Sequence, residues 1–103
     1  MKKTIFLSVA FAAVFASCNR QPTADFDTDL SEYYAGETIH TTNKSLDAES
    51  YKWTLPDGQT SASKDVDYYL PDNFAAGVYT IELEAISKNG KKRSTAKKSF
   101  TVY

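Results

Sequence analysis

Few residues of this chain have side chains that could do chemistry, and none is arranged as a reactive site requires. His40 is the only histidine among the 103 residues, and it lies in a threonine-rich stretch with no cysteine nearby. Zinc needs several histidine or cysteine ligands, so we expect His40 to be an ordinary strand residue. No second histidine and no Gly-x-Ser-x-Gly turn accompanies the serines, as a hydrolase would need. We therefore expect no enzyme, no cofactor and no metal site.

Asp25, Asp27 and Asp29 have the spacing with which a calcium-binding loop begins. Such a loop requires glycine at its sixth position and glutamate at its twelfth, but Leu30 and Gly36 stand there. We expect the three carboxylates to share the solvent face of a strand. Weak calcium binding is the alternative that stays open.

The N-terminus has the pattern of an export signal. Lys2 and Lys3 precede an apolar run from Thr4 to Ala16, which is shorter than the roughly 20 residues that span a bilayer. Phe15-Ala16-Ser17-Cys18 resembles the lipobox of bacterial lipoproteins. We expect residues 1–17 to be removed and Cys18 to be acylated, with palmitate for example, so that it holds the protein in the outer membrane of the bacterial cell envelope. The alternative is an ordinary secretory signal that leaves a free thiol.

The rest of the chain is predicted to be a tether and one all-β domain. Residues 18–24 are the lipidated cysteine and a polar tether with nothing to bury, whose six residues after Cys18 reach at most about 20 Å. Residues 25–103 show about seven alternating segments separated by turn signals, which is typical of an Ig-like β-sandwich. We expect strands around Phe26 and at residues 37–43, 51–55, 59–63, 65–70, 78–87 and 94–103, with Tyr33 to Gly36 as a break. Trp53 is predicted to lie at the centre of the core.

Several short motifs occur in a fixed order: Gly36-Glu37-Thr38-Ile39, Thr42-Asn43-Lys44-Ser45, Tyr51-Lys52-Trp53, Asp57-Gly58, Gly77-Val78-Tyr79-Thr80-Ile81-Glu82-Leu83 and Lys98-Ser99-Phe100-Thr101-Val102. In order and spacing they resemble the polycystic-kidney-disease (PKD) domain, from Ala24 to Tyr103. Thr41 differs, because it stands where that family usually has an apolar core residue. The resemblance implies a non-enzymatic Ig-like module that contacts proteins or carbohydrates or acts as a spacer.

Charge is distributed unevenly along the chain, although its net value is only −1. A net charge so close to zero gives no reason to expect nucleic acid as a partner. All thirteen acids lie at or before Glu84, whereas six of the twelve bases lie between Lys88 and Lys98. The basic hairpin, which we define as Lys88, Lys91, Lys92 and Arg93, is predicted to lie at the N-terminal end and to face the membrane. The alternative is that these residues only keep an exposed hairpin soluble and prevent pairing at the sheet edge.

The predicted topology places several aromatic and acidic residues at the opposite, membrane-distal end. We define the predicted tip as Tyr33, Tyr34, Asp57, Asp72 and Phe74, with Leu55 and Pro56 beside them. Aromatic side chains are common anchors of interfaces, so the tip is the predicted contact for an envelope protein or a glycan. Tyr34 and Phe74 would instead only cap the sandwich if both rings were buried. A structural spacer subunit is the alternative function.

Overall fold

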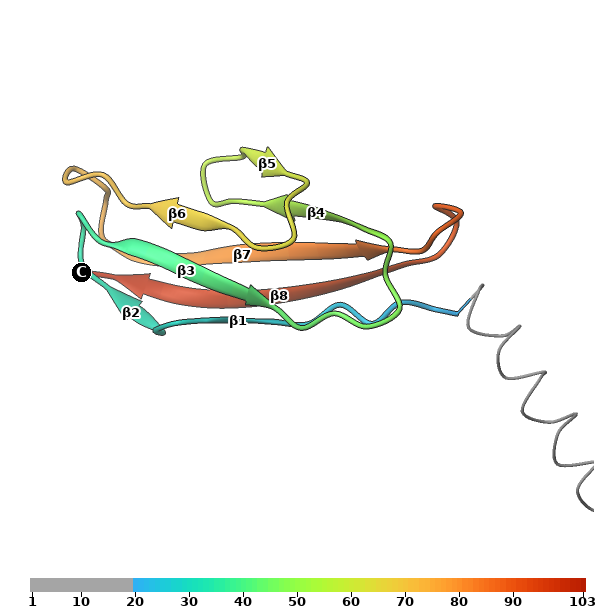
Figure 1. Cartoon of the computed structure of the whole chain (residues 1–103). Coiled ribbons are helices and arrows are strands. Elements are labelled where there is room, and N and C mark those ends of the chain that lie inside the picture. The colour runs from blue at the N-terminus through green and yellow to red at the C-terminus, as the bar shows by residue number, and fades with distance from the viewer. Residues whose placement is uncertain (1–19) are drawn as a thin grey trace, which may run out of the picture.

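The computed structural model describes residues 20–103, and these form two layers of β-strands with a core between them (Figure 1). The predicted signal peptide, residues 1–17, and Cys18 lie outside the described residues. The strands are β1 (Phe26–Thr28), β2 (Glu32–Tyr33), β3 (Thr38–Asn43), β4 (Ser50–Thr54), β5 (Thr60–Ser61), β6 (Asp67–Tyr69), β7 (Gly77–Ile86) and β8 (Arg93–Val102). None of the described residues belongs to a helix that could cross a membrane.

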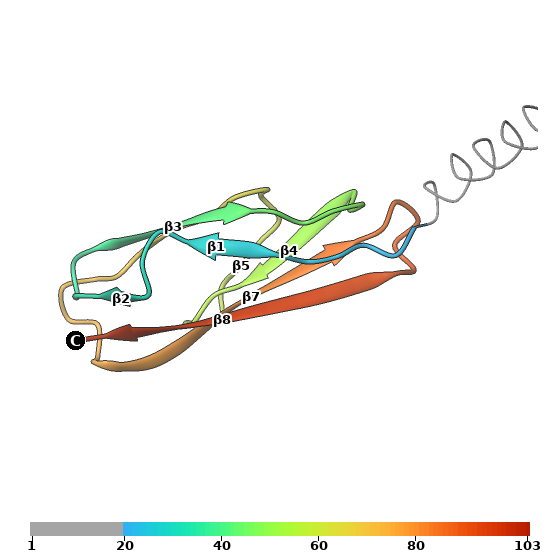
Figure 2. The ribbon, with the colours of Figure 1, turned by 90° about the horizontal axis from the view of Figure 1, so that it is seen from below.

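One sheet has three strands in the order β1-β3-β6, and the other has five in the order β2-β8-β7-β4-β5. All strand pairs are antiparallel except β2 with β8, which is parallel. The long β7–β8 hairpin runs along the whole domain, with Gly77 opposite Val102 and Ile86 opposite Arg93. In Figure 2, the β7–β8 hairpin runs along the lower side of the picture, and β1 and β3 lie above it. The predicted all-β sandwich is confirmed.

Side chains that alternate along the strands fill the space between the sheets. Trp53 is fully buried, and its ring meets Phe26 of the other sheet edge-on, with 5.0 Å between ring centroids. The indole N–H donates a hydrogen bond of 2.8 Å to the carbonyl of Ser63. The alternation predicted for residues 65–70 and 78–87 appears in the burial of every second side chain, with Tyr79 half-buried and the others fully buried: Val66, Tyr68, Leu70, Ile81, Leu83 and Ala85.

Thr41 is buried among these apolar residues, but its hydroxyl has partners on both sides. It donates a hydrogen bond of 2.8 Å to the carbonyl of Val66 and accepts one of 2.9 Å from the Val66 amide. The side chain thus extends the hydrogen bonding between β3 and β6 by one residue before β6 begins. A hydroxyl that is paired in this way is tolerated in a core position where the family usually has an apolar residue.

Two sequence-based expectations about the chain path are wrong. The predicted break at Tyr33 instead contains strand β2, so the structure has eight strands where about seven were expected. The predicted tether is docked along residues 20–24: Pro22 is buried, and Thr23 exchanges backbone hydrogen bonds of 3.0 and 2.9 Å with Leu46. A polar composition did not predict this docking, because the partner of Thr23 lies in a distant loop.

Replacing Trp53 tests the position of the core. Losing a buried tryptophan typically costs about 3 to 5 kcal/mol, which is a large share of the stability of a small domain. We expect Trp53→Ala to lose its cooperative unfolding transition in a thermal melt followed by circular dichroism, whereas Tyr69→Ala, at an exposed ring, keeps it. A sharp transition of Trp53→Ala near the wild-type temperature would contradict the central role of this side chain.

Candidate functional site

A shallow groove of about 430 Å³ lies on the open side of the sandwich, between β6 and the turn that follows β4. Its walls include Asp57, Gln59, Asp67, Tyr69 and Phe74. The groove forms where both sheets end, because β6 is the last strand of one sheet and the two-residue β5 is the last strand of the other. β5 and β6 lie along the upper side of Figure 1.

The carboxylate of Asp57 is held in place at the groove. It accepts a hydrogen bond of 3.0 Å from the amide of Gln59, which orients one acceptor group along the groove. Burial raises the pKa of Tyr68, and the neighbouring Asp57 carboxylate raises this pKa further.

A second carboxylate of the groove is paired across the sheet. The Nδ1 atom of His40 on β3 lies 2.8 Å from Asp67 Oδ1 on β6, and both side chains are exposed. The hydrogen bond that the His40 ring donates to the Asp67 carboxylate raises the pKa of His40 above its ordinary value of 6.5. His40 is thus the strand residue that was expected, with the added role of orienting the Asp67 carboxylate.

Aromatic rings connect the groove to the core. Phe74 is half-buried and meets Tyr79 with 4.8 Å between centroids, and Tyr79 in turn stacks on Phe100 at 5.9 Å. The Tyr79 hydroxyl donates 2.7 Å to the carbonyl of Ala75, so it closes back onto the preceding loop as expected for a tyrosine corner. This ring series fixes the loop that forms one wall of the groove.

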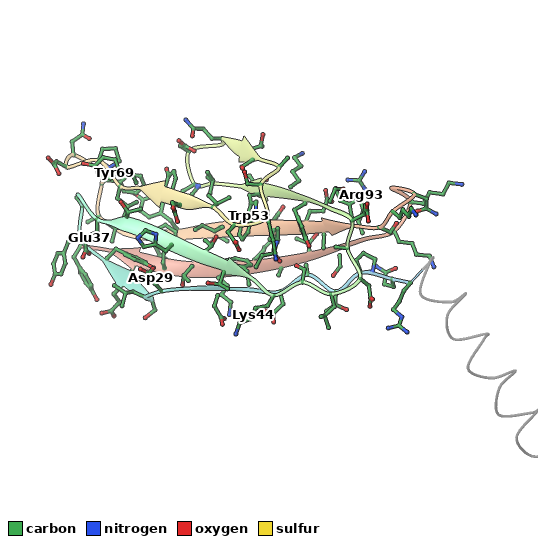
Figure 3. The ribbon with its side chains drawn as sticks, viewed as in Figure 1. Asp29, Glu37, Lys44, Trp53, Tyr69 and Arg93 are labelled. Carbon is green, nitrogen blue, oxygen red and sulfur yellow. The ribbon has the colours of Figure 1, made fainter. Side chains whose placement is uncertain are left out.

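The residues of the predicted tip do not form one cluster. Asp57 and Phe74 line the groove, whereas Tyr34 lies at the end of the domain and is 65% exposed. Asp72 lies over the turn at Gly36, where an added Cβ would come within 2.7 Å of its Oδ1 and where φ is +92°. Figure 3 shows Tyr69 and Glu37 toward this end of the domain, with Arg93 toward the other.

Tyr33 belongs to the core and is not available to a partner. Its ring is 1% exposed and lies 5.8 Å from Phe100, and its hydroxyl donates 2.5 Å to Asp29. Burial and the Asp29 carboxylate raise the pKa of Tyr33 to about 12. The parallel pairing of β2 with β8 turns this ring inward. No local sequence pattern indicates a strand of only two residues.

The three aspartates near the N-terminal edge lie on the solvent side, as expected, and Phe26 between them is buried. Two of them also have protein partners: Asp27 forms ion pairs with Lys44 at 2.5 Å and Lys98 at 3.6 Å, and Asp29 accepts hydrogen bonds from the Tyr33 hydroxyl and from the amide of His40. Within residues 20–103, no group of three or more histidine, cysteine, aspartate or glutamate side chains is placed to hold a metal ion.

The basic hairpin lies at the same end as the first described residues, as the strand order predicted (Figure 1). Gln21 donates 2.7 Å to the carbonyl of Arg93, and the amide of Ala24 donates 3.1 Å to Ser94 Oγ. Lys88, Lys91, Lys92 and Arg93 are all exposed, and Arg93 pairs with Glu84 at 2.8 Å. The hairpin is rigid at its base because the buried Ser87 accepts from the Lys92 amide and donates to Asn89.

The sequence profile of the PKD domain family matches residues 19–102. The chain belongs to the PKD domain family. The match begins before the predicted domain start at Asp25, in agreement with the docked segment that the structure shows at residues 20–24. The comparison with curated proteins gave no match.

Solved structures support the same fold for this PKD domain. The PKD1 domain of the Vibrio cholerae metalloprotease PrtV is 24% identical, with a TM-score of 0.66 over 81% of this chain and 98% of that chain. The PKD1 domain of Vibrio anguillarum Epp is also 24% identical, with a TM-score of 0.65 over 81% and 94% of the two chains. A structure described as a carbohydrate-binding module from the β-sandwich superfamily has a TM-score of 0.71 at 21% identity, over 82% of this chain and 35% of that chain.

The His40–Asp67 pair of the PKD domain predicts a pH dependence. Because the folded-state pKa of His40 is raised, the pair contributes stability that is fully present below the unfolded pKa and is lost as pH rises through the folded pKa. We expect an NMR titration of His40 to give a midpoint above 6.5, and Asp67→Asn to lower it. Asp72→Asn, at the far turn, serves as the control and leaves the midpoint unchanged. Equal midpoints in the wild type and in Asp67→Asn would contradict the pairing.

Proposed function

We propose that the protein is a membrane-anchored, non-enzymatic binding module of the bacterial cell envelope that contacts a protein or carbohydrate partner. Cys18 carries the lipid anchor, and the partner binds the half of the domain that contains the groove. The anchor places the domain close to its membrane, because only Asn19 separates Cys18 from the docked segment that begins at Arg20.

The observation that carries this proposal is the polarity of the domain along its long axis. The first described residues and the basic hairpin lie at one end, and the exposed rings of Tyr34, Tyr69 and Tyr103 lie toward the other. A chain that is anchored at its N-terminus therefore presents the aromatic half outward. Exposed aromatic side chains on a rigid scaffold are typical of binding surfaces.

The groove supports a binding role in its chemistry as well. The exposed Tyr69 ring supplies a flat apolar surface, and Asp57, Gln59 and Asp67 supply polar groups beside it. Sites with this mixture suit a sugar ring or a peptide, because a few polar groups fix orientation while the ring supplies contact area. The carbohydrate-binding module with a similar fold is consistent with a glycan. A spacer would need no such groove.

Site-specific photo-crosslinking in cells tests this function. A photoreactive amino acid is placed at Tyr69 or Asp72 in the full chain, and at Lys52 or Thr95 on the outer face of the five-stranded sheet as matched exposed controls. We expect adducts from the first two positions and none from the controls. A discrete mass shift identifies a protein partner, and a heterogeneous shift that glycosidase removes identifies a glycan.

The same strains test the anchor. Cys18→Ser is expected to abolish incorporation of labelled palmitate, move the protein out of the membrane fraction and reduce the adducts. No adduct from either Tyr69 or Asp72 in the anchored wild-type chain would favour the spacer. Retention of Cys18→Ser in the membrane fraction would contradict the lipid anchor.

We also expect the basic hairpin to face the anionic membrane surface. Basic residues near such a surface strengthen binding by about fivefold each at low salt. Residues 19–103 without the lipid are therefore expected to sediment with anionic liposomes more than with neutral ones, and less at physiological salt. Replacing Lys88, Lys91 and Lys92 with glutamine should abolish the preference. Arg93→Gln alone should have a smaller effect because it removes one of the four bases. Equal sedimentation with both lipids at low salt would refute this orientation.

A further inference from the structure

The end of the domain opposite the basic hairpin carries a pair of exposed tyrosine rings. Tyr34 and Tyr103 are 65% and 57% exposed, and their ring centroids lie 5.8 Å apart with 43° between the ring planes. They come from distant parts of the sequence and meet because β2 pairs with β8, a pairing that the Tyr103 amide continues by donating 3.0 Å to the carbonyl of Tyr33. We call these two residues the tyrosine pair.

A carboxylate contacts each residue of the tyrosine pair. Glu32 lies close enough to the Tyr103 hydroxyl to raise the pKa of Tyr103 through hydrogen bonding and charge. Glu37 Oε1 accepts 2.6 Å from the amide of Tyr34. The turn that carries Glu37 is fixed to the end of β6, because Gly36 donates 2.7 Å to the carbonyl of Leu70 and Leu70 donates 2.8 Å to the carbonyl of Glu37. Rings and carboxylates are thus held by the scaffold before any partner arrives.

Acids outnumber bases at this end of the domain, where Lys98 lies beside Asp29 and Leu30, and where His40 pairs with Asp67. The segments that build this end are residues 29–37, 67–79 and 99–103, and they contain Asp29, Glu32, Glu37, Asp67 and Asp72 but no lysine or arginine. The face of a tyrosine ring is also electrostatically negative. A cation gains from both the rings and the carboxylates, whereas an anion is repelled. A neutral sugar would gain only from the rings.

We propose that the tyrosine pair, together with Glu32 and Glu37, binds an arginine-bearing segment of a second protein. Arginine fits better than lysine, because its planar guanidinium stacks on an aromatic face while its N–H groups reach a carboxylate. This surface is separate from the groove. The proposal rests on the proposed function only in that the anchor turns this end outward, and it can be tested without the anchor.

The test uses residues 19–103, which contain every described strand and the whole family match. The probe is a short peptide of alternating arginine and glycine, titrated into the labelled domain and followed by NMR and calorimetry. We expect Tyr34→Ala and Tyr103→Ala each to weaken binding about two- to fivefold, as for an exposed cation–π contact. Glu32→Gln should weaken binding and reduce its dependence on salt. Leu46→Ala and Glu49→Gln are the matched controls, an exposed apolar side chain and an exposed acid in the loop between β3 and β4, and should bind as the wild type.

Conservative variants separate loss of binding from loss of fold. Tyr103→Phe keeps the ring and removes the hydroxyl beside Glu32. We expect this variant to melt near the wild-type temperature and to bind the arginine peptide more tightly than Tyr103→Ala does. The lysine–glycine peptide should bind more weakly than the arginine peptide.

Three results would overturn the proposal: equal binding by the wild type and both alanine variants, no binding of the arginine peptide even at low salt, or tyrosine-dependent binding of a neutral oligosaccharide at least as strong as that of the peptide. The photo-crosslinks from Tyr69 and Asp72 in cells do not depend on any of these results, so the two proposals fail separately.

Discussion

The fold depends on how one indole side chain joins the two sheets. Trp53 lies on the five-stranded sheet, packs edge-on against Phe26 of the three-stranded sheet, and donates its N–H to Ser63 in the segment that crosses from β5 to β6. Packed sheets lie about 10 Å apart, a distance that a large aromatic ring fills. The same contact therefore sets the spacing of the layers and the path by which the chain changes sheets, and the groove opens beside that crossing.

Much of the fold could be predicted from the sequence, because the deciding signals are local. Alternation along Val78 to Ser87 and along Asp65 to Leu70 identified the buried faces of β7 and β6, and Trp53 was identified as the centre of the core. Features set by distant partners were missed. β2 has two residues and pairs with the far end of the chain, and the burial of Pro22 depends on a docking that the segment itself does not encode.

The candidate site was predictable only in parts. Asp57 and Phe74 were expected to lie on the same partner-binding surface, and they do line one groove, but Tyr69, Gln59 and Asp67 were missed because the groove exists only where two sheet edges face each other. Tyr33 and Tyr34 are neighbours in sequence, but Tyr33 in β2 is buried in the core, whereas Tyr34, directly after β2, is exposed. Alternation could have separated them if β2 had been recognised as a strand. The position of the basic hairpin was predictable, because it follows from strand order alone.

The direction in which the strands run also determines how the domain bears mechanical load. Arg20 and Tyr103 lie at opposite ends of the domain, and the strands run along the axis between them. Hydrogen bonds in antiparallel pairs lie perpendicular to the strands. A pull between the two ends therefore loads the pairing of β1 with β3 and of β7 with β8 in shear, in which the hydrogen bonds of a pair resist together and do not open one after another. The strand direction that separates the basic hairpin from the tyrosine pair thus also makes the domain resist extension along its long axis.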